Sequence, residues 1–359
     1  MNVAHDSRLL TIDVARGIGI LLVVLGHNTV FRESGHGLYE AIYLFHMPLF
    51  FFVSGVTFRL TSPGEALKKR ARALLVPYFM MGAIAVLLAA QSGEIVRVFD
   101  ELRGVLYGTG HTIRFVPLWF LPCLFLVSVS TAVLLGVART SLSLEQFERW
   151  RPRLLAGLAV LALIGGSLVL ASGIFTRPPF TDATGRPLGL PWSLDLLPFV
   201  LAIFVAGVLF CGAGILRDCP MPAAVIVGAC AVLAFLVANG VSLDLNYRRM
   251  TNAFAVLGGI AAGIGLVFAL STLVARVPAL ARVFAYLGSA SLVILLLHSP
   301  LQRRVLEPFV VRGIDSWVTV VLSVSITVAL ISAFDLWILR RVRALGWVVY
   351  PRREAARPA

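Results

Sequence analysis

Residues 9–30 read LLTIDVARGIGILLVVLGHNTV, and this stretch sets the class of protein. A helix needs about 20 mostly apolar residues to cross a hydrocarbon core of roughly 30 Å, and the stretch supplies them. It is too long for the apolar centre of a signal peptide, and no convincing small-residue cleavage site accompanies it. We therefore expect it to remain in the protein as a first transmembrane helix.

The rest of the chain continues this pattern. Of its 359 residues 59% are hydrophobic and 14% charged, and the mean hydropathy is +0.91, which excludes an ordinary water-soluble domain. Apolar runs separated by charged residues, Pro or Gly predict an all-α, polytopic bundle of about ten transmembrane helices. The predicted spans are 9–30, 39–58, 72–90, 117–138, 153–172, 193–216, 221–239, 253–274, 283–301 and 316–339.

No repeat of fixed period and no domain boundary divides the chain. We expect one integral-membrane domain over residues 1–345 and a basic tail over 346–359. Between spans, the polar segment 93–104 predicts a short surface helix, and the proline-rich segment 172–191 predicts an irregular loop.

The net charge of +13 indicates cytoplasmic loops that face anionic membrane lipid, and nucleic acid is not an expected partner. Lys and Arg are more frequent in alternate segments that include both ends of the chain. The densest cluster, Lys68, Lys69, Arg70 and Arg72, lies in a short loop of that set. We expect a multi-pass protein of the cytoplasmic membrane with both termini in the cytoplasm.

The first predicted helix carries three ionisable residues, which the membrane interior tolerates only when they are paired or hydrated. Asp13 and Arg16 are three residues apart and can form an ion pair, which could do no more than position helices. Arg16 and His27 share a helical face but lie about 16 Å apart along it, so they can line one internal path at different depths.

Two further histidines, His46 and His298, fall at the depth of His27 when the predicted spans are threaded through the membrane. A single intramembrane histidine is more often a packing residue, but three at one depth favour a functional cluster. A metal site is not expected, because no carboxylate accompanies them.

Other polar or aromatic residues can be assigned either a structural or a binding role. The four cations from Lys68 to Arg72 are either ordinary cytoplasmic charge or a clamp for the phosphates of a nucleotide cofactor. Trp119 is typical of a membrane-interface anchor, whereas Asp195 and Asp244 could bind sugar hydroxyls. No Walker loop, GxSxG elbow or HExxH motif is present.

The motifs taken together resemble the acyltransferase type 3 membrane family, in its branch related to fucose 4-O-acetylase. The opening RLLTIDVARG (8–17) with GHN (26–28) resembles the Arg-(ten residues)-His signature, and FHMPLFFFVSG (45–55) resembles the second-helix motif. Weaker matches are 69–78, PLWFLP (117–122) and 287–298. The family's basic Arg-x-x-Arg motif appears here as Lys69-x-x-Arg72, with Arg70 between.

The resemblance implies a ten-helix enzyme that moves an acyl group, usually acetyl, from cytoplasmic acyl-CoA to a hydroxyl of a sugar or other cell-envelope acceptor. By motif position His27 is the catalytic histidine and Arg16 the arginine of the same helix. Imidazole is a suitable general base for a hydroxyl, although an acyl-histidine intermediate stays open.

Particular residues are expected to bind the donor and the acceptor. We expect Lys68, Lys69, Arg70 and Arg72 to bind acetyl-CoA, and Asp13, Asn28, His46, Trp119 and His298 to contact substrate. The expected acceptor is a saccharide or lipid-linked saccharide. The competing reading is a transporter or flippase of an envelope precursor, in which the same residues mark a path.

Overall fold

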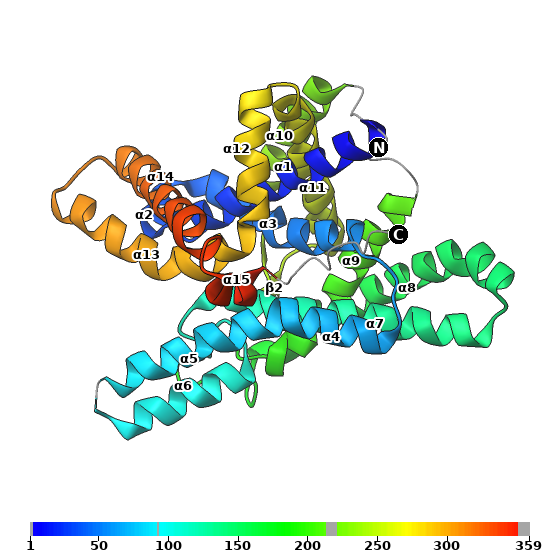
Figure 1. Ribbon diagram of the computed structural model, residues 1–359, viewed down its shortest axis with the longest axis horizontal. Helices are drawn as coiled ribbons and strands as arrows, with labels where there is room; N and C mark the ends of the chain where they lie inside the picture. The colour runs from blue at the N-terminus through cyan, green and yellow to red at the C-terminus, as the bar shows by residue number, and fades with distance from the viewer. Residues whose placement is uncertain (1–2, 92, 213–220, 351–359) are drawn as a thin grey trace.

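The structure is a computed structural model that describes residues 3–91, 93–212 and 221–350, and in these ranges it is almost entirely helical (Figure 1). The long helices are α1 (Val3–Gly26), α3 (His36–Val56), α5 (Val76–Ala90), α7 (Phe120–Ser141), α8 (Leu144–Ser172), α9 (Leu197–Gly212), α10 (Pro222–Ala238), α11 (Ala253–Ala275), α13 (Ser291–Val311) and α14 (Ser316–Phe334).

Shorter elements connect the long helices. They are α2 (Thr29–Ser34), α4 (Pro63–Arg70), η1 (Ala71–Leu75), α6 (Ile95–Tyr107), η2 (Val116–Trp119), η3 (Ile174–Thr176), η4 (Pro191–Leu196), α12 (Pro278–Ser289), η5 (Asp335–Leu339) and α15 (Arg343–Val349). One antiparallel hairpin pairs β1 (Leu243–Asp244) with β2 (Arg249–Met250). The predicted all-α bundle is confirmed, and so is the surface helix after α5, which is α6.

Fewer helices than predicted are long and apolar enough to cross a membrane. Within the described ranges seven meet that test, or eight if the bent pair α12 and α13 counts as one span. The predicted span 221–239 corresponds to α10, which has only 17 residues. Residues 213–216 of another predicted span lie outside the described ranges. The division predicted at residue 345 falls inside α15.

Two predicted continuous spans are interrupted. The first ends at Gly26 rather than Val30, because Asn28 caps a new helix: its side-chain oxygen accepts from the backbone N–H of Phe31 at 3.1 Å. The span 283–301 bends by 76° between α12 and α13. The bend follows Gly288 and Ser289, a residue pair of the kind at which sharp kinks occur.

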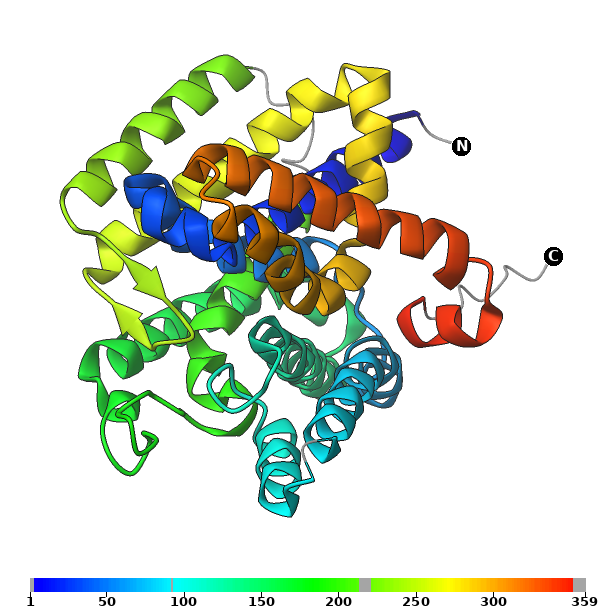
Figure 2. The ribbon, with the colours of Figure 1, turned by 90° about the vertical axis from the view of Figure 1, so that its left-hand side faces the viewer.

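The helices form two groups. In both Figure 1 and Figure 2, α4 to α8 lie together below α1, α11, α12 and α14. Helix α9 connects the groups, because it packs on α8 and on α3. Helix α1 lies at the centre of its group and contacts α3, α11, α12 and α13.

Glycines allow two of these helix pairs to touch through their backbones. A methyl group added at Gly17 would overlap the carbonyl of Phe284, and one added at Gly288 would overlap the carbonyl of Asp13. Gly55 and Gly207 make the same reciprocal contact between α3 and α9. Close approach at small residues is the usual way in which helices associate within a membrane.

The bundle has two ends of different composition. The hairpin end carries the β hairpin, α2 and the loops before η2 and η4; Figure 2 shows the hairpin as two arrows on the left. The basic end carries Lys68, Lys69, Arg70 and Arg72 together with Thr57, where α3 stops. The start of α1 and helix α15 both lie away from the hairpin in Figure 2.

Candidate active site

A cavity of about 370 Å³ opens at the hairpin end and leads to His27 and His46. Its walls come from elements far apart in the sequence: the end of α1, α3, the loop before η2, the hairpin and α13. The residues lining it are Val23, Gly26, His27, Asn28, Thr29, Arg32, Tyr39, Tyr43, His46, Met47, His111, Val116, Pro117, Trp119, Arg186, Leu243, Asp244, Leu245, Asn246, Tyr247, Leu295, Ser299 and Arg303.

His27 directly follows the last residue of α1, where helical carbonyls lack amide partners. The carbonyl oxygen of Val23 lies 2.9 Å from Nδ1 of His27 and 3.1 Å from its backbone nitrogen. A carbonyl can only accept, so Nδ1 carries the proton and Nε2 keeps its lone pair. The fold thus fixes the tautomer in which Nε2 can act as a base.

The other two histidines adopt the same arrangement. Nδ1 of His46 lies 3.0 Å from the Ile42 carbonyl, and Nδ1 of His298 lies 2.9 Å from the Ile294 carbonyl. The His298 ring meets the His27 ring edge-on, with centroids 5.2 Å apart. Nε2 of His298 is buried and has no hydrogen-bond partner among the described residues. The three imidazoles therefore lie close together, and no Nε2 atom among them has a hydrogen-bond partner within the described residues.

Aromatic side chains form one wall of the cavity. The Tyr39 and Tyr43 rings lie 4.2 Å apart between centroids, and Tyr43 lies 4.7 Å from the His46 ring. The Tyr43 hydroxyl donates to the carbonyl of Gly26 at 3.2 Å, which ties α3 to the end of α1. Trp119 is buried and lines the same cavity. Such a wall suits the apolar face of a sugar ring.

Asn28 and Gln302 connect helices beside the histidines. The Asn28 side chain caps α2, and its amide nitrogen donates to the Ser323 hydroxyl at 2.9 Å, so both of its groups are used within the fold. Gln302, which we did not predict, lies one turn after His298 and donates to the Val24 carbonyl at 3.1 Å. Its spacing of four residues from His298 was the only signal in the sequence.

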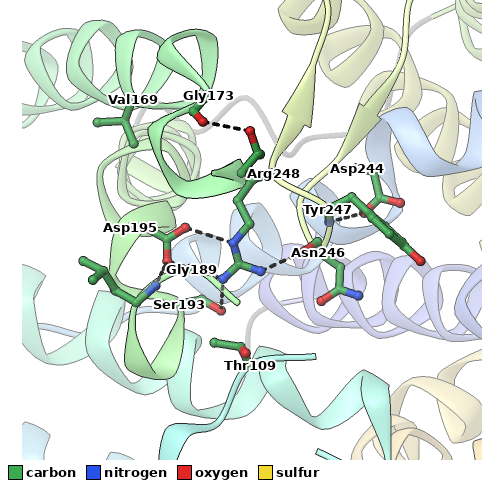
Figure 3. Close-up of polar contacts among 12 residues, drawn as sticks. Thr109, Val169, Gly173, Gly189, Ser193, Asp195, Asp244, Asn246, Tyr247 and Arg248 are labelled. Atoms are coloured by element: carbon green, nitrogen blue, oxygen red, sulfur yellow. Dashed lines mark hydrogen bonds and ion pairs between the residues drawn. The ribbon is translucent and has the colours of Figure 1, made fainter. Parts of the chain in front are cut away.

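A buried ion pair fixes the hairpin against η4 (Figure 3). Arg248 Nε donates to Asp195 Oδ2 at 3.0 Å, and Arg248 Nη1 donates to the Asn246 carbonyl at 2.8 Å. Asp195 also accepts from the backbone N–H of Leu190 at 2.9 Å. Asp195 is therefore occupied by structural contacts, and its side chain does not belong to the cavity lining.

Asp244 lies in the cavity wall. Its carboxylate accepts from the backbone N–H of Tyr247 at 3.0 Å, as Figure 3 shows. Burial raises the pKa of Asp244 above its ordinary range, and the backbone hydrogen bonds of Tyr247 and Asn246 oppose this shift.

The basic end holds a second polar cluster. Arg16 lies 3.6 Å from the Asp13 carboxylate, as the spacing predicted, and its Nη2 donates to the Thr57 hydroxyl at 3.0 Å. Arg70 stacks over the Phe58 ring at 5.8 Å and lies near enough to Arg16 for the two charges to repel. Such a pair of cations, with one carboxylate beside them, is suited to bind an anion.

The four predicted cations of the loop are not equivalent. Lys68 and Lys69 are exposed on α4, whereas Arg70 and Arg72 are half-buried, the latter in η1. None of these four, nor Asp13 or Arg16, belongs to the lining of the hairpin-end cavity. The structure thus separates the predicted site residues into two groups on opposite sides of the bundle.

Within the described ranges no cluster of three or more His, Cys, Asp or Glu side chains is placed to hold a metal ion. Cys123 is buried and Cys230 is exposed, and within the described ranges neither forms a disulfide; Cys219 lies outside those ranges.

Comparisons with known proteins agree with this architecture. A family model described as an acyltransferase domain matches residues 9–336, nearly the whole chain. The nodulation protein NolL of Sinorhizobium fredii (strain NBRC 101917 / NGR234) is 38% identical over 90 residues, which are 22% of this chain and 25% of that protein. The match therefore spans about a quarter of this relative. No solved structure matches the chain.

Proposed function

The chain belongs to the type 3 acyltransferase family, and from this premise we propose that it is a membrane O-acyltransferase that uses His27 as its general base. The proposed donor is acyl-CoA, most simply acetyl-CoA, bound at the basic end. The proposed acceptor is a hydroxyl of a saccharide or lipid-linked saccharide that enters the cavity at the hairpin end. The observation that carries the proposal is the free Nε2 of His27 inside that cavity.

In the proposed reaction, Nε2 of His27 takes the proton of the acceptor hydroxyl while its oxygen attacks the thioester carbonyl carbon. The carbon–sulfur bond breaks as the new ester forms. The departing thiolate then receives the proton from the imidazolium, which yields free CoA and returns His27 to its neutral form. No other reactant is needed, and direct transfer explains the arrangement without an acyl-histidine.

The hydrogen bonds of the other histidines bear on their roles. His46 and His298 already donate Nδ1–H to backbone carbonyls, so in this tautomer they have no N–H left for a developing oxyanion. Their Nε2 atoms can accept a hydrogen bond from a hydroxyl. We therefore assign them to orienting the acceptor.

Arg16 and Arg70 are the proposed contacts for donor phosphates, because they lie close together and are partly shielded from water. Asp13 keeps Arg16 in place through their ion pair. Lys68, Lys69 and Arg72 add positive charge around this pair. Arg16 is about 16 Å along α1 from His27, so its role is in donor binding rather than at the reacting atoms.

The decisive experiment compares His27→Asn with His36→Asn in purified protein supplied with labelled acetyl-CoA and a panel of envelope glycans. Asn keeps a donor near the position of Nδ1 but has no counterpart of Nε2. His36 is exposed at the start of α3 with φ of 36°, a conformation that Asn tolerates.

We expect His27→Asn to reduce transfer by roughly 10²- to 10⁴-fold, the usual contribution of a general base, and His36→Asn to retain it. Both variants should elute as the parent does in size-exclusion chromatography. Unchanged transfer by a well-folded His27→Asn protein would remove His27 from the chemistry.

A further inference from the structure

The mouth of the hairpin-end cavity is strongly basic. Arg32, Arg186 and Arg303 line it, whereas Asp244 is the only carboxylate among its lining residues. The three arginines come from α2, the loop after α8 and α13, so the chain folds them together from distant positions. All three are exposed at the surface.

Several other arginines pair with acidic side chains. Arg97, Arg103, Arg114 and Arg151 each lie within 3.6 Å of a carboxylate, and the buried Arg248 pairs with Asp195. In the part of the chain that the structure describes, no ion pair or side-chain hydrogen bond is formed by Arg32, Arg186 or Arg303. Asp182 lies close enough to Arg186 for their charges to attract, and Asp244 lines the cavity. The three guanidinium groups outnumber these two carboxylates and together attract an anion.

The same cavity holds two polar atoms that are buried and have no hydrogen-bond partner within the described ranges: Nε2 of His111 and Oδ1 of Asn246. Leaving such atoms unpaired is costly unless a ligand or water satisfies them. The amide oxygen of Asn246 accepts from hydroxyl groups. The His111 ring packs edge-on against Tyr247, with centroids 4.6 Å apart.

From these observations, and resting on the proposed function, we infer that the acceptor is an anionic saccharide, whose carboxylate or phosphate contacts Arg32, Arg186 and Arg303 while its hydroxyls contact Asn246 and the histidines. The aromatic wall of Tyr39 and Tyr43 packs against the sugar ring. The arginines lie at the mouth and His27 lies deeper, so the charge is on a part of the acceptor remote from the hydroxyl that is acylated.

Burial and the charges of Arg248 and Arg186 lower the pKa of His111, so this ring is neutral at pH 7. His111 therefore adds hydrogen-bonding capacity rather than a fourth charge. The attraction for an anion at neutral pH depends on the three arginines alone.

Binding without acyl-CoA tests this inference separately from catalysis. Methyl glucoside, methyl glucuronate and glucose 1-phosphate are titrated into the full-length protein in neutral detergent, and binding is measured by calorimetry. The glucuronate and the phosphate represent the two possible sources of the negative charge. The variants are Arg303→Gln and, as a matched control, Arg304→Gln, because Arg304 is exposed but is not part of the cavity lining.

We expect at least one anionic glycoside to bind about tenfold more tightly than the neutral one, a preference that Arg303→Gln reduces and Arg304→Gln preserves. Higher salt should weaken the preference. Equal binding of all three compounds, or no binding of either anionic compound, overturns the inference.

An acyl-transfer assay distinguishes failure of the anionic-acceptor inference from failure of the proposed function. If the enzyme acetylates a neutral glycan, and a triple variant with Gln at positions 32, 186 and 303 does so equally well, the acyltransferase assignment stands and the anionic acceptor is excluded. If the anionic glycosides bind as expected but the His27→Asn variant transfers normally, the acceptor class stands and the general base is wrong.

Discussion

At His27 a single carbonyl oxygen determines which ring nitrogen can accept a proton. Val23 O receives both the backbone N–H and the Nδ1–H of His27. The ring nitrogens of His46 and His298 likewise contact the carbonyl four residues earlier. The proposed base is thus oriented by local helix geometry rather than by a neighbouring carboxylate. This arrangement differs from a catalytic triad, in which an acidic side chain orients the imidazole.

Donor binding can be tested one residue at a time at the basic end. Arg70→Gln removes a half-buried cation near Arg16, and Lys68→Gln removes an exposed one from the same helix. A charge-assisted hydrogen bond contributes about 1.5–3 kcal/mol, so Arg70→Gln should raise KM for acetyl-CoA by roughly tenfold or more. Lys68→Gln should change KM little.

The measurement is the initial rate against acetyl-CoA concentration at a fixed acceptor concentration. Since neither residue lies in the histidine cavity, kcat should be nearly unaffected in both variants. A larger effect of Lys68→Gln than of Arg70→Gln would show that the donor binds on the outer surface of α4.

Sequence patterns predicted which residues of the candidate site lie together, but they did not predict the distant contacts that hold the surrounding loops. The grouping of His27, His46 and His298 follows from span depth, and the Asp13–Arg16 pair follows from helical spacing. The link between Arg248 and Asp195 joins positions 53 residues apart. No local periodicity encodes a contact of that kind.

At the scale of elements, backbone contact between helices depends on individual glycines. Gly288 has no room for a methyl group against Asp13, whereas a methyl group at Gly258 in α11 would meet nothing within 4 Å. Glycines within a predicted span indicate close helix packing, but the sequence does not show which of them face a neighbouring helix. The 76° bend beside Gly288 was likewise hidden within an unbroken apolar run.

Replacing these two glycines by alanine should therefore change the stability of the protein in opposite directions. Gly288→Ala should destabilise the protein by about 1–3 kcal/mol, because the backbones of α1 and α12 must separate. Gly258→Ala should be neutral or stabilising by up to about 1 kcal/mol, because alanine favours a helix over glycine. Thermal unfolding in detergent, followed by the loss of the monodisperse peak in size-exclusion chromatography, measures both. A stable Gly288→Ala protein would contradict the close α1–α12 contact.

At the scale of the whole molecule, the two candidate sites lie at opposite ends of the bundle, as transfer across a membrane would require. The charge distribution predicts that the basic end faces the cytoplasm. Placing single cysteines at Lys68 and at Thr184 tests this, because both positions are exposed and lie at different ends. The native cysteines are first replaced by Ser.

In intact cells a membrane-impermeant maleimide should label Thr184→Cys and leave Lys68→Cys unlabelled. Permeabilised cells should show labelling of both, which controls for reactivity. The reverse pattern would place the histidine cavity on the cytoplasmic side and would invert the proposed routes of donor and acceptor.

The glycine contacts also bear on the permeability of the membrane. An enzyme that receives one reactant from each compartment must not let ions leak between them. At the four glycines of α1–α12 and α3–α9, carbonyl oxygens of the neighbouring helix fill the space in which a side chain would otherwise stand, so no water molecule fits at these contacts. Conduction of protons needs a continuous file of water molecules, and these contacts interrupt such a file along the two helix pairs.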